Sequence, residues 1–117
     1  MKRGSPKSLR SSDSFRQFVL DQLETLEVRA RSMFGGTGLY VGEHFFGIIA
    51  SEVLYLKVDD VNRDMFVKAG MKPFKPHAGR PVTMKYYAVP LEVLESAAEL
   101  ERWARAAVAA ARRAAEG

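Results

Sequence analysis

The stretch from Met33 to Val41, with the sequence MFGGTGLYV, restricts the fold more than any other part of the chain. It places three glycines between bulky apolar residues. Glycine adopts positive φ angles and allows close backbone approach at little steric cost, so Gly35, Gly36 and Gly38 predict a sharp bend or bulge. Strand-forming residues follow directly. The sequence therefore predicts a glycine hinge that opens a β-rich segment.

The glycine hinge does not match the known phosphate-binding loops. The dinucleotide motif needs G-x-G-x-x-G between a strand and a helix, and the P-loop needs a trailing Gly-Lys followed by Ser or Thr. Here Gly36-Thr37-Gly38 continues into strand formers, and no Lys-Ser or Lys-Thr pair follows. A glycine-hinged strand pair is therefore expected in preference to a phosphate cradle.

The first half of the chain shows one helical pattern and then several strand patterns. Apolar residues recur at spacings of three and four from about 14 to 27, and Ser14 with Gln17 forms a capping-box pattern at the start. Strand-like runs follow at 28–33, 39–41, 45–50 and 53–58. The links between the last three have hairpin length, so these strands are expected to be neighbours in an antiparallel meander.

The second half adds two helices around a further strand. Asp59 or Asp60 is expected to cap a helix that runs to about residue 69, and Gly70 occupies the position that follows a helix end. After a proline-rich basic loop, residues 82–89 read as a strand. Ser96 then forms a capping box with Glu99 and opens a long alanine-rich helix.

This order of elements favours an α+β fold. We expect a two-layer arrangement in which an antiparallel sheet of about five strands carries helices on one face, in the order α-β-β-β-α-β-β-α. Runs of strands interrupted by a single helix favour this arrangement over a doubly wound parallel sheet.

Length and composition indicate one soluble domain. The chain has 117 residues and no cysteine, which excludes disulfides and thiolate zinc sites and is compatible with a reducing cytosol. No apolar run follows the basic N-terminus or reaches the length of a membrane span. We expect a disordered basic tail over 1–12, a single domain over 13–117, a cytoplasmic location and no membrane partner.

Positive charge is unevenly distributed along the chain. The formal net charge is +4, but residues 57–87 alone hold seven Lys or Arg and three Asp, which is also +4. The tail adds four more basic residues without an acid. This asymmetry is expected of a protein with an anionic partner, although surface lysines that serve solubility give the same pattern.

The residues needed for catalysis are scarce. His44 and His77 are the only histidines, and they are too few and too far apart for a zinc site. Neighbouring Asp59 and Asp60 are better explained by helix capping than by an acid pair. We therefore expect no enzymatic activity, no metal and no cofactor.

The basic loop and the strand after it are the candidate contact surface. Tyr86 and Tyr87 are adjacent in a strand, so one ring is expected in the core and the other outside, where it could anchor a protein or stack on a base. The basic or cationic candidates in this surface are Lys72, Lys75, His77, Arg80 and Lys85. No helix-turn-helix, zinc finger or other base-reading motif accompanies them.

Four ordered motifs resemble the N-terminal domain of the TfoX/Sxy family of competence regulators. They are the glycine hinge, LYLKVD at 54–59, AGMKPF at 69–74 and MKYYAVP at 84–90. The resemblance spans about residues 13–113 and implies a two-layer fold similar to secretion chaperones. Full-length regulators of the family append a helical C-terminal domain, which we do not expect in this sequence of 117 residues.

Three functions are consistent with these observations. By the resemblance, the chain is expected to be a non-enzymatic module that acts in transcriptional regulation of competence genes by contacting a protein such as a transcription factor. The alternative is a weak, sequence-tolerant nucleic-acid binder that contacts DNA phosphates. A small-ligand or enzymatic domain built on the glycine hinge is a third hypothesis. The alanine face of the last helix also leaves a homodimer open.

Overall fold

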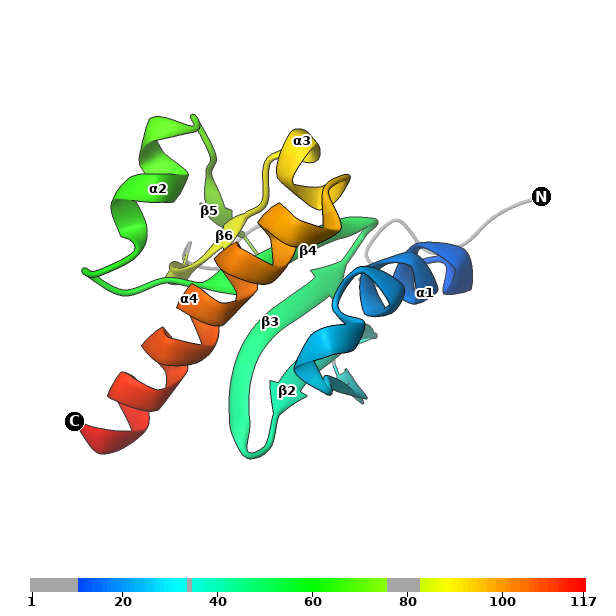
Figure 1. The fold of residues 1–117 in the computed structure, drawn as a ribbon, viewed down its shortest axis with the longest axis horizontal. Helices are drawn as coiled ribbons and strands as arrows, with labels where there is room; N and C mark the ends of the chain where they lie inside the picture. Colours follow the sequence, from blue (N-terminus) through cyan, green and yellow to red (C-terminus); the bar gives the residue numbers. More distant parts are fainter. Residues whose placement is uncertain (1–10, 34, 76–82) are drawn as a thin grey trace.

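The computed structural model describes residues 11–33, 35–75 and 83–117, which form one helical layer on a curved sheet (Figure 1). The elements in these segments are α1 (Asp13–Gln22), the 3-10 turn η1 (Glu24–Leu26), β1 (Arg29–Met33), β2 (Gly36–Val41), β3 (His44–Ala50), β4 (Val53–Lys57), α2 (Arg63–Lys68), β5 (Pro73–Phe74), β6 (Thr83–Ala88), α3 (Leu91–Leu94) and α4 (Ala97–Glu116). Figure 1 shows α4 crossing in front of β4 with β3 beside it, and α4 packs against both strands.

The described strands form one antiparallel sheet with the order β1-β2-β3-β4-β6-β5. The first four strands are sequential neighbours, which confirms the predicted meander and the α+β class. The sheet has six described strands where about five were expected, and four of them precede α2 where the expected order had three. Strand β5, for which no sequence pattern was found, is only two residues long. A strand of this length shows no periodicity, and its proline is typical of an edge position.

Two tight turns in the meander use left-handed backbone. Gly42 takes a φ of +59° between β2 and β3. Ser51 and Glu52 take φ values of +51° and +64° between β3 and β4, although neither is glycine. Positive φ at both central residues is the pattern of a type I′ hairpin turn, which asparagine and glycine adopt at lower cost than serine or glutamate.

We therefore expect Ser51→Asn to stabilise the protein. The gain should be about 0.5 kcal/mol, a fraction of the cost of left-handed backbone for an ordinary residue. The melting temperature measured by circular dichroism should rise by roughly 2–4 °C. Ser51→Val is the control and should lower the melting temperature, since a β-branched side chain is disfavoured at positive φ. Equal changes in melting temperature for Ser51→Asn and Ser51→Val would contradict the backbone strain that we assign to this turn.

Helix α1 begins earlier than the sequence suggested. Its N-cap is Ser12, whose hydroxyl accepts a hydrogen bond from the Phe15 amide at 3.1 Å, so the capping box predicted at Ser14 is wrong. Ser12 also binds the Glu52 carboxylate through its amide and its hydroxyl. Ser11 accepts a hydrogen bond from the Glu52 amide. These contacts include Ser11 and Ser12 in the domain, while residues 1–10 of the predicted tail lie outside the described residues.

Helix α2 begins later than expected, at Arg63 and not at Asp59 or Asp60. The amide of Val61 and the guanidinium of Arg113 both donate to the carboxylate of Asp59, which is therefore committed outside the helix. The end of α2 matches the prediction. Gly70 takes a φ of +76°, and the amides of residues 70 and 71 bond to the carbonyls of residues 67 and 66, which is the Schellman arrangement.

The core lies between α4 and the sheet. Phe66 of α2 is fully buried there and contacts the rings of Tyr87 and Trp103, with centroids 5.9 and 4.8 Å away. The predicted alanine face of α4 is buried in part, which agrees with the default prediction that it packs within the chain. Its buried members are Ala107, Ala110 and Ala111, whereas Ala106 and Ala109 are half-buried and Ala114 is exposed.

An ion pair fixes the C-terminal part of α4 to the link between β4 and α2. Arg113 donates to both carboxylate oxygens of Asp59, at 2.6 and 3.0 Å. The hydrogen bond from Arg113 is the main cause that lowers the pKa of Asp59 below its usual value, and the backbone amide of Val61 adds to it. The charged form of Asp59 is therefore favoured in the folded state.

We expect this pair to contribute to stability only above acidic pH. Because the folded-state pKa of Asp59 is depressed, its contribution is present above the unfolded value of 3.8 and is lost as pH falls through the folded value. Asp59→Asn should lower the free energy of unfolding at pH 7 by about 0.5–1 kcal/mol, the range for a partly exposed pair. Urea titrations at pH 7 and at about pH 3 test this, since the difference between variant and wild type should shrink at the lower pH. A constant difference would contradict the assignment.

Candidate interaction surface

Three of the cations predicted for the contact surface are described, and they lie on or beside β5 and β6 at one edge of the sheet. Lys72 and Lys75 flank β5 and are exposed, and Lys85 is exposed on β6. The carbonyl of Lys72 accepts a hydrogen bond from the amide of Ala88, which fixes the backbone before β5. His77 and Arg80 lie outside the described residues. The described part of this group, which we call the basic edge, is therefore Lys72, Lys75 and Lys85.

The two tyrosines of β6 point to opposite faces of the sheet, as predicted. Tyr87 belongs to the core beneath α4. Tyr86 lies on the other face, but it is only 8% exposed, so the predicted exposed anchor is wrong. Tyr86 belongs instead to a second cluster of strand residues that includes Phe74 and Phe45. Burial, with a smaller contribution from Tyr40, raises the pKa of the Tyr86 phenol to about 12.

Aromatic rings and cations meet on this second face. The rings of Tyr40, Phe45 and Tyr86 form a row across β2, β3 and β6, with centroid distances of 5.1 and 5.6 Å. Cations lie over both ends of the row. We name this set the open sheet face: Arg29, Arg31, Tyr40, Phe45, Lys57 and Tyr86.

The cations of the open sheet face contact the rings directly. The guanidinium carbons of Arg29 and Arg31 lie 5.7 and 5.8 Å from the centre of the Tyr40 ring. The Lys57 ammonium lies 5.2 Å from the centre of the Tyr86 ring, whose residue is its direct partner in the β4–β6 register. Burial, with the neighbouring charge of Lys85, lowers the pKa of Lys57. These contacts are cation–π interactions, which hold each cation against a ring.

Sequence reasoning missed the open sheet face, although a signal for it was present. Arg29 and Arg31 are two residues apart in a strand and so must share one face. The residue that lies opposite each arginine depends on the register of the β1–β2 hairpin. Arg29 is paired with Tyr40 because β1 and β2 are joined at the glycines. A β-bulge also shifts the pairing of β2 with β3 at Tyr40, which brings Phe45 opposite that ring.

The glycine hinge lies partly inside a strand. Gly35 takes a φ of +82° and precedes β2, as expected for a bend. Gly36 and Gly38 instead belong to β2, where Met33 pairs with Gly36. A side chain at Gly38 would approach the end of Met33 to 2.5 Å and the Phe45 ring to 3.1 Å. Gly38 therefore leaves space for side chains on the open sheet face.

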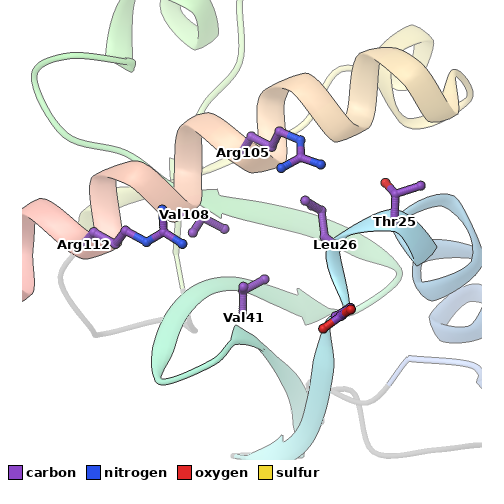
Figure 2. A pocket seen from close by; sticks show the side chains of 7 residues that line it. Thr25, Leu26, Val41, Arg105, Val108 and Arg112 are labelled. Carbon is purple, nitrogen blue, oxygen red and sulfur yellow. The ribbon is translucent and has the colours of Figure 1, made fainter.

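Two depressions in the described surface are too small for a typical ligand. The first, of about 180 Å³, lies between η1, β2 and α4. Figure 2 shows Leu26, Val41 and Val108 along it, with Arg105 and Arg112 on α4. The second, of about 250 Å³, adjoins Gly36. Ligand pockets usually hold roughly 300–1,000 Å³, so neither supports the small-ligand hypothesis.

Several of the polar groups beside these depressions have partners. Arg105 of the first donates to the Glu101 carboxylate at 2.8 Å, and Thr25 donates to the same carboxylate at 2.9 Å. In the second depression Arg16 is paired with Asp13 at 2.8 Å. Over the described ranges, no three His, Cys, Asp or Glu side chains lie close enough together to hold a metal ion. None of the helices described is long and apolar enough to cross a bilayer.

Comparison with known families gives a match over most of the chain. The profile of the TfoX N-terminal domain matches residues 20–111, from within α1 to the last turns of α4. The chain belongs to the TfoX N-terminal domain family. The match includes the glycine hinge, both ends of the basic edge and the open sheet face. No curated protein matches the sequence. The TfoX N-terminal domain is associated with competence regulators.

Proposed function

We propose that this TfoX N-terminal domain is a non-enzymatic contact module that regulates transcription of competence genes by binding a transcription factor in the cytoplasm. Family membership over residues 20–111 is the observation that carries the proposal. Two observations support a contact role: the two depressions described above are small, and Lys72 and Lys75 are exposed.

The basic edge is the surface that we assign to the protein partner. Lys72 and Lys75 are exposed on either side of β5, which is the last strand of the sheet. An edge strand presents backbone groups to a partner chain, and lysines beside it favour an acidic partner while opposing self-association. Complementary charge of this kind steers association and selects partners more than it adds affinity.

Replacement of the gene in its host tests this function. Deletion should change the transcript levels of competence genes, and the wild-type gene should restore them. The double charge reversal Lys72→Glu with Lys75→Glu should fail to restore them, while leaving the melting temperature within roughly 2 °C of wild type, because both side chains are exposed. Transcript sequencing and circular dichroism provide the two measurements.

The matched control is Lys68→Glu with Arg112→Glu, which makes the same change in net charge at exposed positions of α2 and α4. This control should restore transcription. If the deletion leaves transcription of competence genes unchanged, the regulatory proposal is wrong. Full restoration by the Lys72 and Lys75 variant would exclude the basic edge as the contact surface.

A further inference from the structure

Acidic residues are absent from all six described strands. All fourteen Asp and Glu residues of the sequence lie in helices, turns or links. The strands instead carry Arg29, Arg31, His44, Lys57 and Lys85. The described strands therefore contribute no negative side chain to the surface of the sheet. The charged side chains that an anion meets on these strands are all basic.

The open sheet face combines this charge with aromatic rings. Leu39 and Val41 on either side of Tyr40 pack in the core beneath α4, so Tyr40 points to the opposite face. Phe45, Tyr55 and Tyr86 are likewise placed in or against the second cluster, which strand residues build. Tyr40, Phe45 and Tyr55 are only half-buried. This face thus presents partly exposed rings between Arg29 and Arg31 at one end and Lys57 at the other.

We propose that the open sheet face is a binding site for single-stranded nucleic acid without sequence preference. Its cations would contact successive phosphates, and its rings and guanidinium planes would stack with bases, which every single-stranded sequence offers. A duplex hides the faces of its bases within the helix and would meet only the cations. An acidic peptide would also meet only the cations. The proposal concerns a surface other than the basic edge and does not depend on the proposed function.

The site predicts how binding depends on salt. Three phosphate contacts, from Arg29, Arg31 and Lys57, give a slope of about −2 in log affinity against log salt for a single strand. Raising salt from about 50 to 200 mM should therefore weaken binding about 20-fold. Stacking adds a component of the binding free energy that salt does not remove, because stacking involves no counterion release.

Fluorescence anisotropy with the full chain tests the site. The probe is a labelled mixed-sequence single-stranded DNA of about 12 nucleotides, within the range that one domain covers. We expect micromolar binding at low salt and a loss of about tenfold on Arg29→Glu with Arg31→Glu. Tyr40→Ser should weaken binding at least about fivefold, the lower end for loss of one stacking partner.

The control is Arg102→Glu with Arg112→Glu on α4, which makes the same change in net charge in the helical layer. It should bind like wild type, and melting curves should show that each variant is folded. Absence of binding at low salt would overturn the proposal, as would equal loss in the control. Equal affinity for a duplex of the same length or for polyglutamate would also overturn it, because the site would then recognise charge alone.

Discussion

Phe66→Ala should lower the free energy of unfolding by about 3–5 kcal/mol, the usual cost of truncating a fully buried aromatic residue. Phe66 has no exposed surface, and it joins the short helix α2 to the main core through Tyr87 and Trp103. The contact with Trp103 is edge-to-face, at an interplanar angle of 76°, and such pairs add about 0.5–1.5 kcal/mol beyond the area they bury. Urea denaturation followed by circular dichroism measures the change.

Val67→Ala is the matched control for this experiment. It removes a neighbouring apolar side chain from the same helix, but Val67 is 53% exposed, so its loss should cost less than about 1 kcal/mol. Since domains of this size are stable by only about 5–15 kcal/mol, the two variants should differ clearly in their urea midpoints. Similar midpoints would show that α2 is not anchored through Phe66.

Ala107→Leu should destabilise the protein by about 1–3 kcal/mol. Ala107 has no exposed surface on the face of α4 that packs against β3 and β4. Added methylenes at such a site force the helix away from the sheet or push side chains out of their rotamers, because protein interiors are closely packed. The melting temperature should fall by at least roughly 4 °C.

Ala114→Leu is the control for this substitution, since Ala114 is exposed near the end of the same helix. Leucine and alanine are both good helix formers, so the control should change stability by less than about 0.5 kcal/mol. A homodimer formed through the alanine face, which the sequence left open, would require that face to leave the sheet. A neutral effect of Ala107→Leu would contradict the intramolecular packing.

The antiparallel meander and the helix ends with strong local signals could be predicted from the sequence. Gly70 and Ser96 have the predicted roles because backbone conformation and capping depend on neighbouring residues. Ser12 was missed because its role depends partly on Glu52, forty positions away. The prediction that Asp59 caps a helix was wrong for a similar reason. Its partner Arg113 is remote in sequence, so no local pattern indicates this contact.

The candidate surfaces were predictable only in part. Exposure of Lys72 and Lys75 follows from their type and their position around a short strand. The burial of Tyr86 could not be predicted, because alternation along a strand states which face a ring takes and not what covers it. Phe45 and Phe74 supply that cover from other strands. The row of rings likewise depends on a bulge and on the strand order, which are tertiary features.

The acidic side chains of the molecule lie in its helices, turns and links, and the six described strands carry none. The basic edge and the open sheet face both belong to the sheet. We assign the first to a protein partner and the second to single-stranded nucleic acid. A transcriptional regulator that contacts a DNA-bound factor would bring both surfaces close to nucleic acid, and the two can be tested separately by the charge reversals given above.

Site-specific photocrosslinking in the host cell tests the contact proposal most directly. A photoreactive amino acid replaces Lys75 on the basic edge, and the same amino acid at exposed Lys68 of α2 serves as the control. Mass spectrometry of the crosslinked protein then identifies the partner. We predict a crosslink from position 75 to a transcription factor, with no such product from position 68. Identical products from the two positions, or a partner at position 75 without a role in transcription, would contradict it.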